Sequence, residues 1–175
     1  MRISKLISCL SAVMLLASAN AGRAETTIEL KGTHLCCPAC VKAVGEILKG
    51  VDGVTGKCDT KAKTVTLTAK DDATAQKAID ALAAGGFHGD TGSKTVTIKE
   101  DSGVAKGKVK TLSVTDVHNC CGACTKSIKD AVKKVEGVTV NTVKPRTTTF
   151  EVTGDFDAEA VIKALNAAGF HAKVK

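Results

Sequence analysis

Thiol and imidazole side chains gather in two short stretches of the sequence. The stretch beginning at His34 reads His-Leu-Cys-Cys-Pro-Ala-Cys, and the stretch beginning at His118 reads His-Asn-Cys-Cys-Gly-Ala-Cys. Two cysteines separated by two residues can reach the same ion, and thiolates prefer soft or borderline cations such as Cu(I), Zn(II) and Hg(II). The two stretches therefore predict two metal sites, with about one ion for each.

Each stretch offers more ligands than one thiol pair. A third cysteine and a histidine precede each Cys-x-x-Cys pair, and another histidine follows a Gly-Phe pair later in each half. A third or fourth ligand would suit Zn(II), which is usually four-coordinate. The predicted metal ligands are His34, Cys36, Cys37, Cys40 and His88 in the first half and His118, Cys120, Cys121, Cys124 and His171 in the second.

The last thiol of each stretch is expected at the start of a helix. Free backbone amides and the positive end of the helix dipole lower a thiol pKa there, so Cys40 and Cys124 should be available as thiolates. Cys58 has no counterpart in the second half. A packed strand residue is favoured over an accessory ligand at that position.

The sequence around each stretch also repeats, which predicts two copies of one structural unit. Residues 27–30 and 111–114 alternate apolar and polar side chains, as half-buried strands do. A helical spacing, two strands, a second helix and a closing strand at 95–98 or 172–174 follow. This order predicts an α+β fold of two tandem ferredoxin-like βαββαβ sandwiches.

The path of the chain through such a unit predicts where the later histidines lie. The turn after the second helix falls at the same end of the unit as the cysteine loop. His88 is therefore expected to face Cys37 and Cys40, and His171 to face Cys121 and Cys124. Whether the two sites act separately or hold one ion between the units is open at this stage.

The N-terminus has the pattern of a secretory signal peptide. Arg2 and Lys5 precede a short apolar run, and cleavage after Ala24 is favoured over cleavage after Ala21. Removal of residues 1–24 lowers the net charge from +7 to about +4. We expect an exported protein, periplasmic or secreted and not integral to a membrane, with units at 25–100 and 111–175 and a linker at 101–110.

Other classes of protein have less support. Scattered lysines and the absence of Trp and Tyr argue against a nucleic-acid partner. The Cys-x-x-Cys spacing also occurs in thiol-disulfide redox proteins, and export would place this one in an oxidising space. A module that only docks a partner transporter is a third alternative. No cofactor or phosphate-binding motif indicates an enzyme.

The loop motif and the element order resemble the heavy-metal-associated domain of copper chaperones, the periplasmic mercury-binding protein and metal-pumping ATPases. The resemblance implies that Cys37 and Cys40 bind one metal ion and that Cys121 and Cys124 bind another. It also implies a role in metal transport, buffering or detoxification without catalysis. The implied partner is a metal transporter or another acceptor protein. The family loop has Met-Thr where this sequence has Leu35-Cys36 and Asn119-Cys120. The added cysteines and histidines put the usual copper assignment in question.

Overall fold

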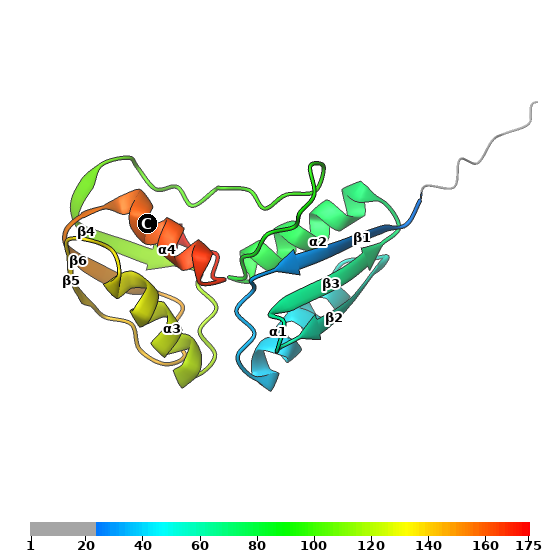
Figure 1. The fold of residues 1–175 in the computed structure, drawn as a ribbon, viewed down its shortest axis with the longest axis horizontal. Coiled ribbons are helices and arrows are strands. Elements are labelled where there is room, and N and C mark those ends of the chain that lie inside the picture. Colours follow the sequence, from blue (N-terminus) through cyan, green and yellow to red (C-terminus); the bar gives the residue numbers. More distant parts are fainter. Residues whose placement is uncertain (1–23) are drawn as a thin grey trace, which may run out of the picture.

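Two antiparallel sheets, each with two helices, form the structure. The computed structural model describes residues 24–175, so the predicted signal peptide lies outside the described residues except for Ala24. Figure 1 shows two units side by side, with the cysteine-containing loops before α1 and α3 approaching each other between them. We call residues 26–90 the first unit and residues 108–175 the second.

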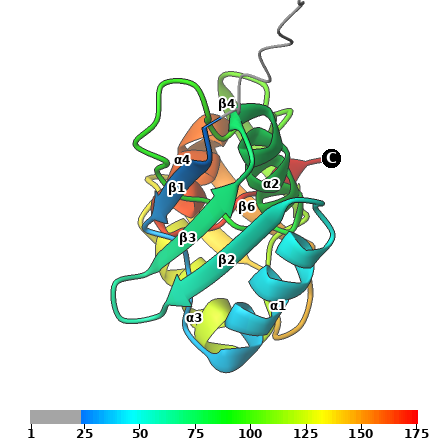
Figure 2. The same cartoon turned by 90° about the vertical axis from the view of Figure 1, so that its right-hand side faces the viewer.

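The first unit has a three-stranded sheet in the order β1-β3-β2. Its β1 pairs antiparallel with β3, with Ile28 opposite Leu67 and Leu30 opposite Val65. Both helices pack against this sheet and against each other, as Figure 2 shows from the side of this unit. Its elements are β1 (Thr26–Lys31), α1 (Pro38–Lys49), β2 (Val54–Asp59), β3 (Thr64–Ala69) and α2 (Asp72–Ala84).

The second unit has a four-stranded sheet in the order β5-β6-β4-β7. This order places the first and third strands of the unit at the centre, as in a ferredoxin-like sandwich. The predicted α+β class is confirmed. The elements are β4 (Lys108–Thr115), α3 (Gly122–Lys133), β5 (Val138–Asn141), β6 (Phe150–Asp157), α4 (Ala158–Ala167) and β7 (Lys173–Val174).

The closing strand predicted at 95–98 in the first unit is wrong. After one isolated bridge between Lys31 and Asp90, an Asp90 carboxylate accepts from the Gly92 amide and turns the chain away from the sheet edge. The side chain of Gln76 on α2 then bonds both the amide and the carbonyl of Thr97, at 2.9 and 2.8 Å. A helix side chain thus satisfies backbone groups that a strand neighbour would otherwise satisfy.

Apolar side chains at alternate positions of the strands fill each core. Phe150 and Val152 of β6 are buried, as are Ile128 and Val132 of α3, and all four belong to the buried core. Val140 of β5 is the large apolar side chain left exposed among the described residues, at 56%. Apolar burial therefore runs through both units, with one face of each helix toward the sheet.

Replacement of Val132 by Ala should destabilise the second unit. The fully buried isopropyl group would leave a cavity, so we expect the free energy of unfolding to fall by about 2 kcal/mol. Val140→Ala makes the same chemical change at an exposed position and should stay within about 0.5 kcal/mol of wild type. Chemical denaturation of both variants measures the difference, and equal losses would contradict this account of the core.

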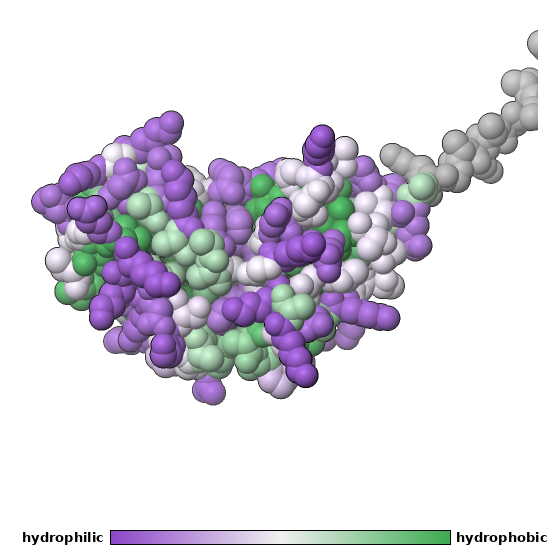
Figure 3. All heavy atoms as spheres, in the orientation of Figure 1, coloured by the Kyte–Doolittle hydropathy of each residue, from purple (hydrophilic) through white to green (hydrophobic). Residues whose placement is uncertain are grey.

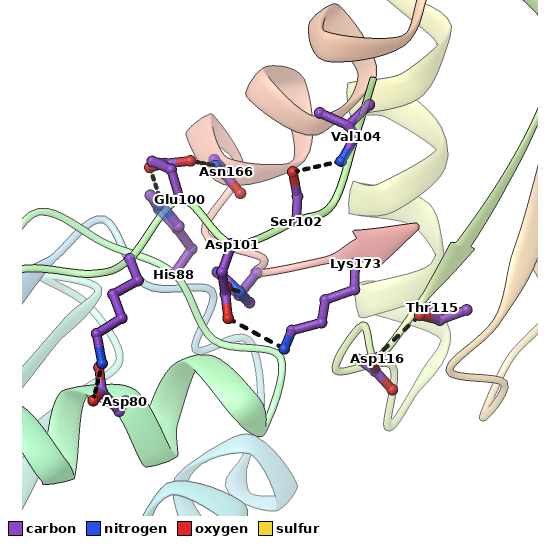
Figure 4. A network of polar contacts seen from close by, with 12 residues as sticks. Asp80, His88, Glu100, Asp101, Ser102, Val104, Thr115, Asp116, Asn166 and Lys173 are labelled. Atoms are coloured by element: carbon purple, nitrogen blue, oxygen red, sulfur yellow. Dashed lines mark hydrogen bonds and ion pairs between the residues drawn. The ribbon is translucent and has the colours of Figure 1, made fainter. Parts of the chain in front are cut away.

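The segment between the units packs against both of them. Its Glu100 carboxylate accepts from the Asn166 side chain of α4 at 3.1 Å, and Asp101 lies 3.2 Å from Lys173 of β7 (Figure 4). On the other side, Lys99 lies 2.7 Å from Asp80 of α2. Because β4 begins at Lys108, the last three residues of the predicted linker belong to a strand. Residues 99–102 therefore hold the segment between the units against both of them, and we call these residues the strap.

The visible surface is mainly polar. Figure 3 shows hydrophilic side chains spread over both units on the face that it presents. Within residues 24–175, none of the helices combines the length and apolar character that crossing a bilayer requires.

Candidate metal centre

Both cysteine loops lead directly into a helix. Cys37 is the N-cap residue of α1, with Pro38 at the first helical position, and Cys121 is the N-cap residue of α3. Neither helix has a side-chain cap hydrogen bond. The Cys40 amide donates to the Cys37 carbonyl, and the Thr125 amide donates to the Cys121 carbonyl, each at 3.1 Å. Cys40 and Cys124 lie in the first turns and are fully buried. The first-turn position is the one expected for both thiols, but the lowered pKa predicted for both is found for Cys40 alone of the two. The prediction is wrong for Cys124, because its contact with Cys40 raises its pKa.

Each loop also lies against the Gly-Phe-His turn of the other unit. The amides of His34 and His88 both donate to the Gly169 carbonyl, at 3.3 and 3.1 Å, and the His171 amide donates to the Gly86 carbonyl at 3.1 Å. Phe87 and Phe170 form an antiparallel bridge between the two turns. The contacts are reciprocal, so the two units meet in an arrangement with approximate twofold symmetry.

This meeting brings the six motif thiols into one cluster. Within the loops, Cys37 Sγ lies 3.7 Å from Cys40 Sγ, and Cys121 Sγ lies 3.7 Å from Cys124 Sγ. Equally short distances cross between the units: 3.6 Å from Cys37 to Cys120, 3.6 Å from Cys36 to Cys121 and 3.9 Å from Cys40 to Cys124. The cysteines of both motifs therefore form one thiol-rich centre.

Two imidazoles complete the cluster from outside. His34 stacks on Phe170 and His118 stacks on Phe87, with ring centroids 4.4 and 4.3 Å apart, so each ring is held by the other unit. The Nε2 atom of each ring is buried without a hydrogen-bond partner. Ligand atoms of His118, Cys40, Cys120 and Cys124 lie within 4.8 Å of one another, as do those of His34, Cys36 and Cys124. A metal ion held by either group would satisfy the imidazole nitrogen of that group.

His88 and His171 do not join these groups. Their rings are parallel, with centroids 6.1 Å apart, and each faces a carboxylate of the segment between the units. His88 Nε2 lies 3.5 Å from Glu100 (Figure 4), and His171 Nε2 lies 3.0 Å from Asp101. The expected approach of these two imidazoles to Cys37 with Cys40 and to Cys121 with Cys124 is not seen. The turn is at the expected end of each unit, but its histidine contacts the other unit and the segment between the units, and not the thiols.

One residue that shapes the centre, Asn119, was not assigned a structural role from the sequence. Asn119 is buried and donates to the carbonyls of Lys144 and Thr147, and it accepts from the Thr125 hydroxyl on α3. It therefore anchors the second loop to the β5–β6 connection, whereas the equivalent Leu35 is simply buried. The sequence feature that could have indicated this role is a polar residue placed between a histidine and a cysteine. Cys58 is partly buried against the core and lies outside the ligand groups.

The thiols of the metal-free centre differ in acidity. Hydrogen bonding from Cys124 lowers the pKa of the Cys40 thiol, and the same contact raises the pKa of Cys124. Burial raises the pKa of Cys36 to about 12 and also raises the pKa of Cys120. A backbone hydrogen bond from Cys124 lowers the pKa of Cys121 to about 6. Some thiolate is therefore present at neutral pH, and an incoming cation would displace the remaining thiol protons.

Acid should weaken the metal-free protein through His34. Burial lowers the pKa of this imidazole, opposed by the neighbouring Cys40 and assisted by Lys63 and His118. Because the unfolded chain binds the proton first, stability present above the unfolded pKa near 6.5 is lost as pH falls below it. His34→Phe keeps the stacking ring, so its stability should depend less on pH between 7 and 5. Urea unfolding at several pH values tests this, and an unchanged slope would contradict it.

Comparison with known proteins points to one family for the second unit. Residues 111–171 match the sequence model of the heavy-metal-associated domain. A comparison with curated proteins gave no match. The fold and the thiol centre, together with this match, support a metal-binding protein.

Solved structures similar to the whole chain are distant. Two structures of the soluble N-terminal region of Bacillus subtilis CopA, described as a P-type ATPase, are 18% and 21% identical, each with a TM-score of 0.30. Both comparisons cover 87% of this chain, and 95% and 93% of the other chain. The first two RRM domains of the yeast poly(U)-binding protein Pub1 are 12% identical with a TM-score of 0.23, over 86% and 98% of the two chains.

Proposed function

We propose that this chain is an exported carrier or buffer of a soft metal ion, of the Cu(I), Zn(II) or Hg(II) class, with both units built on the heavy-metal-associated plan. Its role is to bind and pass on metal, or to sequester it for detoxification, and not to catalyse a reaction. A metal transporter or another thiol-containing acceptor would exchange the ion with it.

One observation carries the proposal: six thiols and two unpartnered buried imidazole nitrogens converge where the units meet. Such a set would be costly as a structural core, because buried polar nitrogens without partners destabilise a fold. Thiolate and imidazole are ligands for soft and borderline cations. Cys36 and Cys121 lie at the outer side of the cluster, one exposed and one partly exposed, which leaves a route for ligand exchange with an acceptor.

Metal titration of the mature protein tests the proposal. The protein is purified anaerobically, its free thiols are counted, and it is titrated in parallel with Cu(I) and Zn(II) against chelators of known affinity. We expect tight binding of at least one of these ions and protection of the motif thiols from alkylation. Absence of binding to fully reduced protein would overturn the proposal.

The redox alternative is examined with the same sample. Thiols 3.5 to 3.9 Å apart can be oxidised to disulfides after a small movement. If the reduced protein binds no soft metal but exchanges disulfides rapidly with a substrate, the thiol-disulfide function replaces the metal-binding one. Export into an oxidising space would also make bound metal useful as protection for the thiols.

Removal of the His118 ring should affect Zn(II) more than Cu(I). Zn(II) prefers four ligands, a ring nitrogen of His118 lies within 4.8 Å of the Cys40 and Cys120 thiols, and the Nε2 atom of this ring is buried without a hydrogen-bond partner. His118→Ala is therefore expected to weaken Zn(II) binding by at least about tenfold, with a smaller loss for Cu(I), which can be held by thiolates alone. His88→Ala is the matched control and should leave both affinities close to wild type. Equal loss of Zn(II) affinity in the two variants would contradict this assignment.

A further inference from the structure

The distances between thiols divide the cluster into two equivalent halves. Cys37, Cys40 and Cys120 form one triangle, with Sγ distances of 3.7, 3.6 and 3.6 Å. Tetrahedral coordination with bonds of about 2.3 Å requires ligand sulfurs about 3.8 Å apart. This triangle therefore fits one face of such a site without rearrangement.

The second triangle is the twofold counterpart of the first. It consists of Cys121, Cys124 and Cys36, with distances of 3.7, 3.5 and 3.6 Å. In both triangles the Cys-x-x-Cys pair of one unit is joined by the additional cysteine of the other unit. The two triangles share no thiol, and together they use all six.

The imidazoles show the same reciprocal arrangement between the units. His118 lies with Cys40, Cys120 and Cys124, and His34 lies with Cys36 and Cys124. Each histidine can therefore extend the triangle that contains the additional cysteine of its own loop and the thiol pair of the other unit. Both candidate sets contain three sulfurs and one nitrogen, a donor set known to suit structural Zn(II).

We propose that the protein binds two ions in reciprocal sites, each completed by the opposite unit. One site comprises Cys37, Cys40, Cys120 and His118, and the other comprises Cys121, Cys124, Cys36 and His34. The added cysteine and histidine of each motif serve the neighbouring unit and not their own. This inference rests on the proposed soft-metal function and specifies its ligands and stoichiometry.

Grouping the three thiols of one loop would also use all six, but such a trio has two short Sγ distances, 3.7 Å from Cys40 to both Cys36 and Cys37, where each reciprocal triangle has three. Other groupings use the thiols less completely. Two inner triangles are also possible. One consists of Cys40, Cys120 and Cys124, and the other of Cys40, Cys36 and Cys124. Both contain the edge between the buried thiols Cys40 and Cys124. Two ions on triangles with a common edge would lie too close together, and Cys37 and Cys121 would be unused. A single ion with four ligands would leave further thiols unbound. The outer triangles share neither a thiol nor an edge and give each ion three sulfurs.

The reciprocal assignment can be tested with ¹¹³Cd(II), a soft probe whose NMR shift reports its sulfur ligands. The full mature chain loaded with cadmium should give two resonances. Cys37→Ser should change one resonance and Cys121→Ser the other, which assigns them. Cys120→Ser should then change the resonance affected by Cys37→Ser, and Cys36→Ser the resonance affected by Cys121→Ser. Circular dichroism of each variant checks that the fold is retained.

Each outcome distinguishes this inference from the proposed function. If Cys120→Ser changes the Cys121 resonance instead, each unit holds its own ion and the reciprocal sites are excluded. A single resonance, or one set of signals that every variant changes, would show one shared ion or a bridged cluster, and would also overturn the assignment while the metal-binding function stands. If the reduced protein shows no bound cadmium at all, the proposed function itself fails.

Discussion

Replacement of both Cys40 and Cys124 by Ser is expected to abolish tight binding of Cu(I). These two thiols are fully buried, lie in the first turns of α1 and α3, and contact each other across the units at 3.9 Å. A serine hydroxyl is a poor ligand for a soft cation, and each candidate site would lose its most enclosed sulfur. We expect the affinity to fall by more than the roughly 100-fold that loss of an outer-shell partner costs.

Cys58→Ser provides the control for that double variant. Cys58 is a thiol of β2 that lies outside the ligand groups, so its loss should leave Cu(I) affinity unchanged. Competition against a Cu(I) chelator under anaerobic conditions measures all three proteins. Wild-type affinity in the Cys40→Ser, Cys124→Ser protein would show that the buried thiols do not hold the metal.

Gly169→Ala is expected to separate the two units. Gly169 has a φ of +87°, and an added Cβ would collide with the backbone of Gly32 and His34 in the first unit. The left-handed alanine costs about 1–2 kcal/mol whether or not the units are in contact, whereas forced overpacking costs about 1–3 kcal/mol in the contact itself. A loss of about 3 kcal/mol in the contact between the units would lower the affinity of a site shared by them by up to about 100-fold.

Gly92→Ala separates the effect of backbone strain from the effect of the contact. Gly92 also has a positive φ, of +60°, but nothing lies within 4 Å of the position where a Cβ would stand. We expect a stability loss of about 1 kcal/mol and unchanged metal affinity. Small-angle scattering should show a more extended particle for Gly169→Ala alone. A compact Gly169→Ala protein with wild-type metal affinity would contradict a binding site between the units.

The local features of the fold could be predicted because their causes are local. The alternation in β1 and β4 and the helical spacing after each cysteine loop depend on which side chains face one sheet, and the structure has these elements. The failure at residues 95–98 has a distant cause, since Gln76 bonds Thr97 across 21 residues. Strand propensity does not report that a helix side chain will take the place of a neighbouring strand.

The centre could be predicted in composition but not in pairing. Cysteine spacing identified both thiol pairs, because residues 37 and 40 are brought together by one helical turn. The path of the chain identified the end of each unit at which His88 and His171 lie. It could not show that the opposite unit would cover that end, because the fit of Gly86 and Gly169 against the opposite loops arises only in the assembled chain. The local sequence pattern likewise could not predict that the carboxylates of Glu100 and Asp101 would face His88 and His171.

The strap formed by residues 99–102 has a consequence for metal retention. A comparable thiol centre assembled from two separate molecules would fall apart on dilution, since half of its ligands would diffuse away. Here Lys99, Glu100 and Asp101 fasten the connection to α2, α4 and β7, so the second set of ligands is held at a high and constant effective concentration. Metal affinity should therefore be independent of how much protein is present.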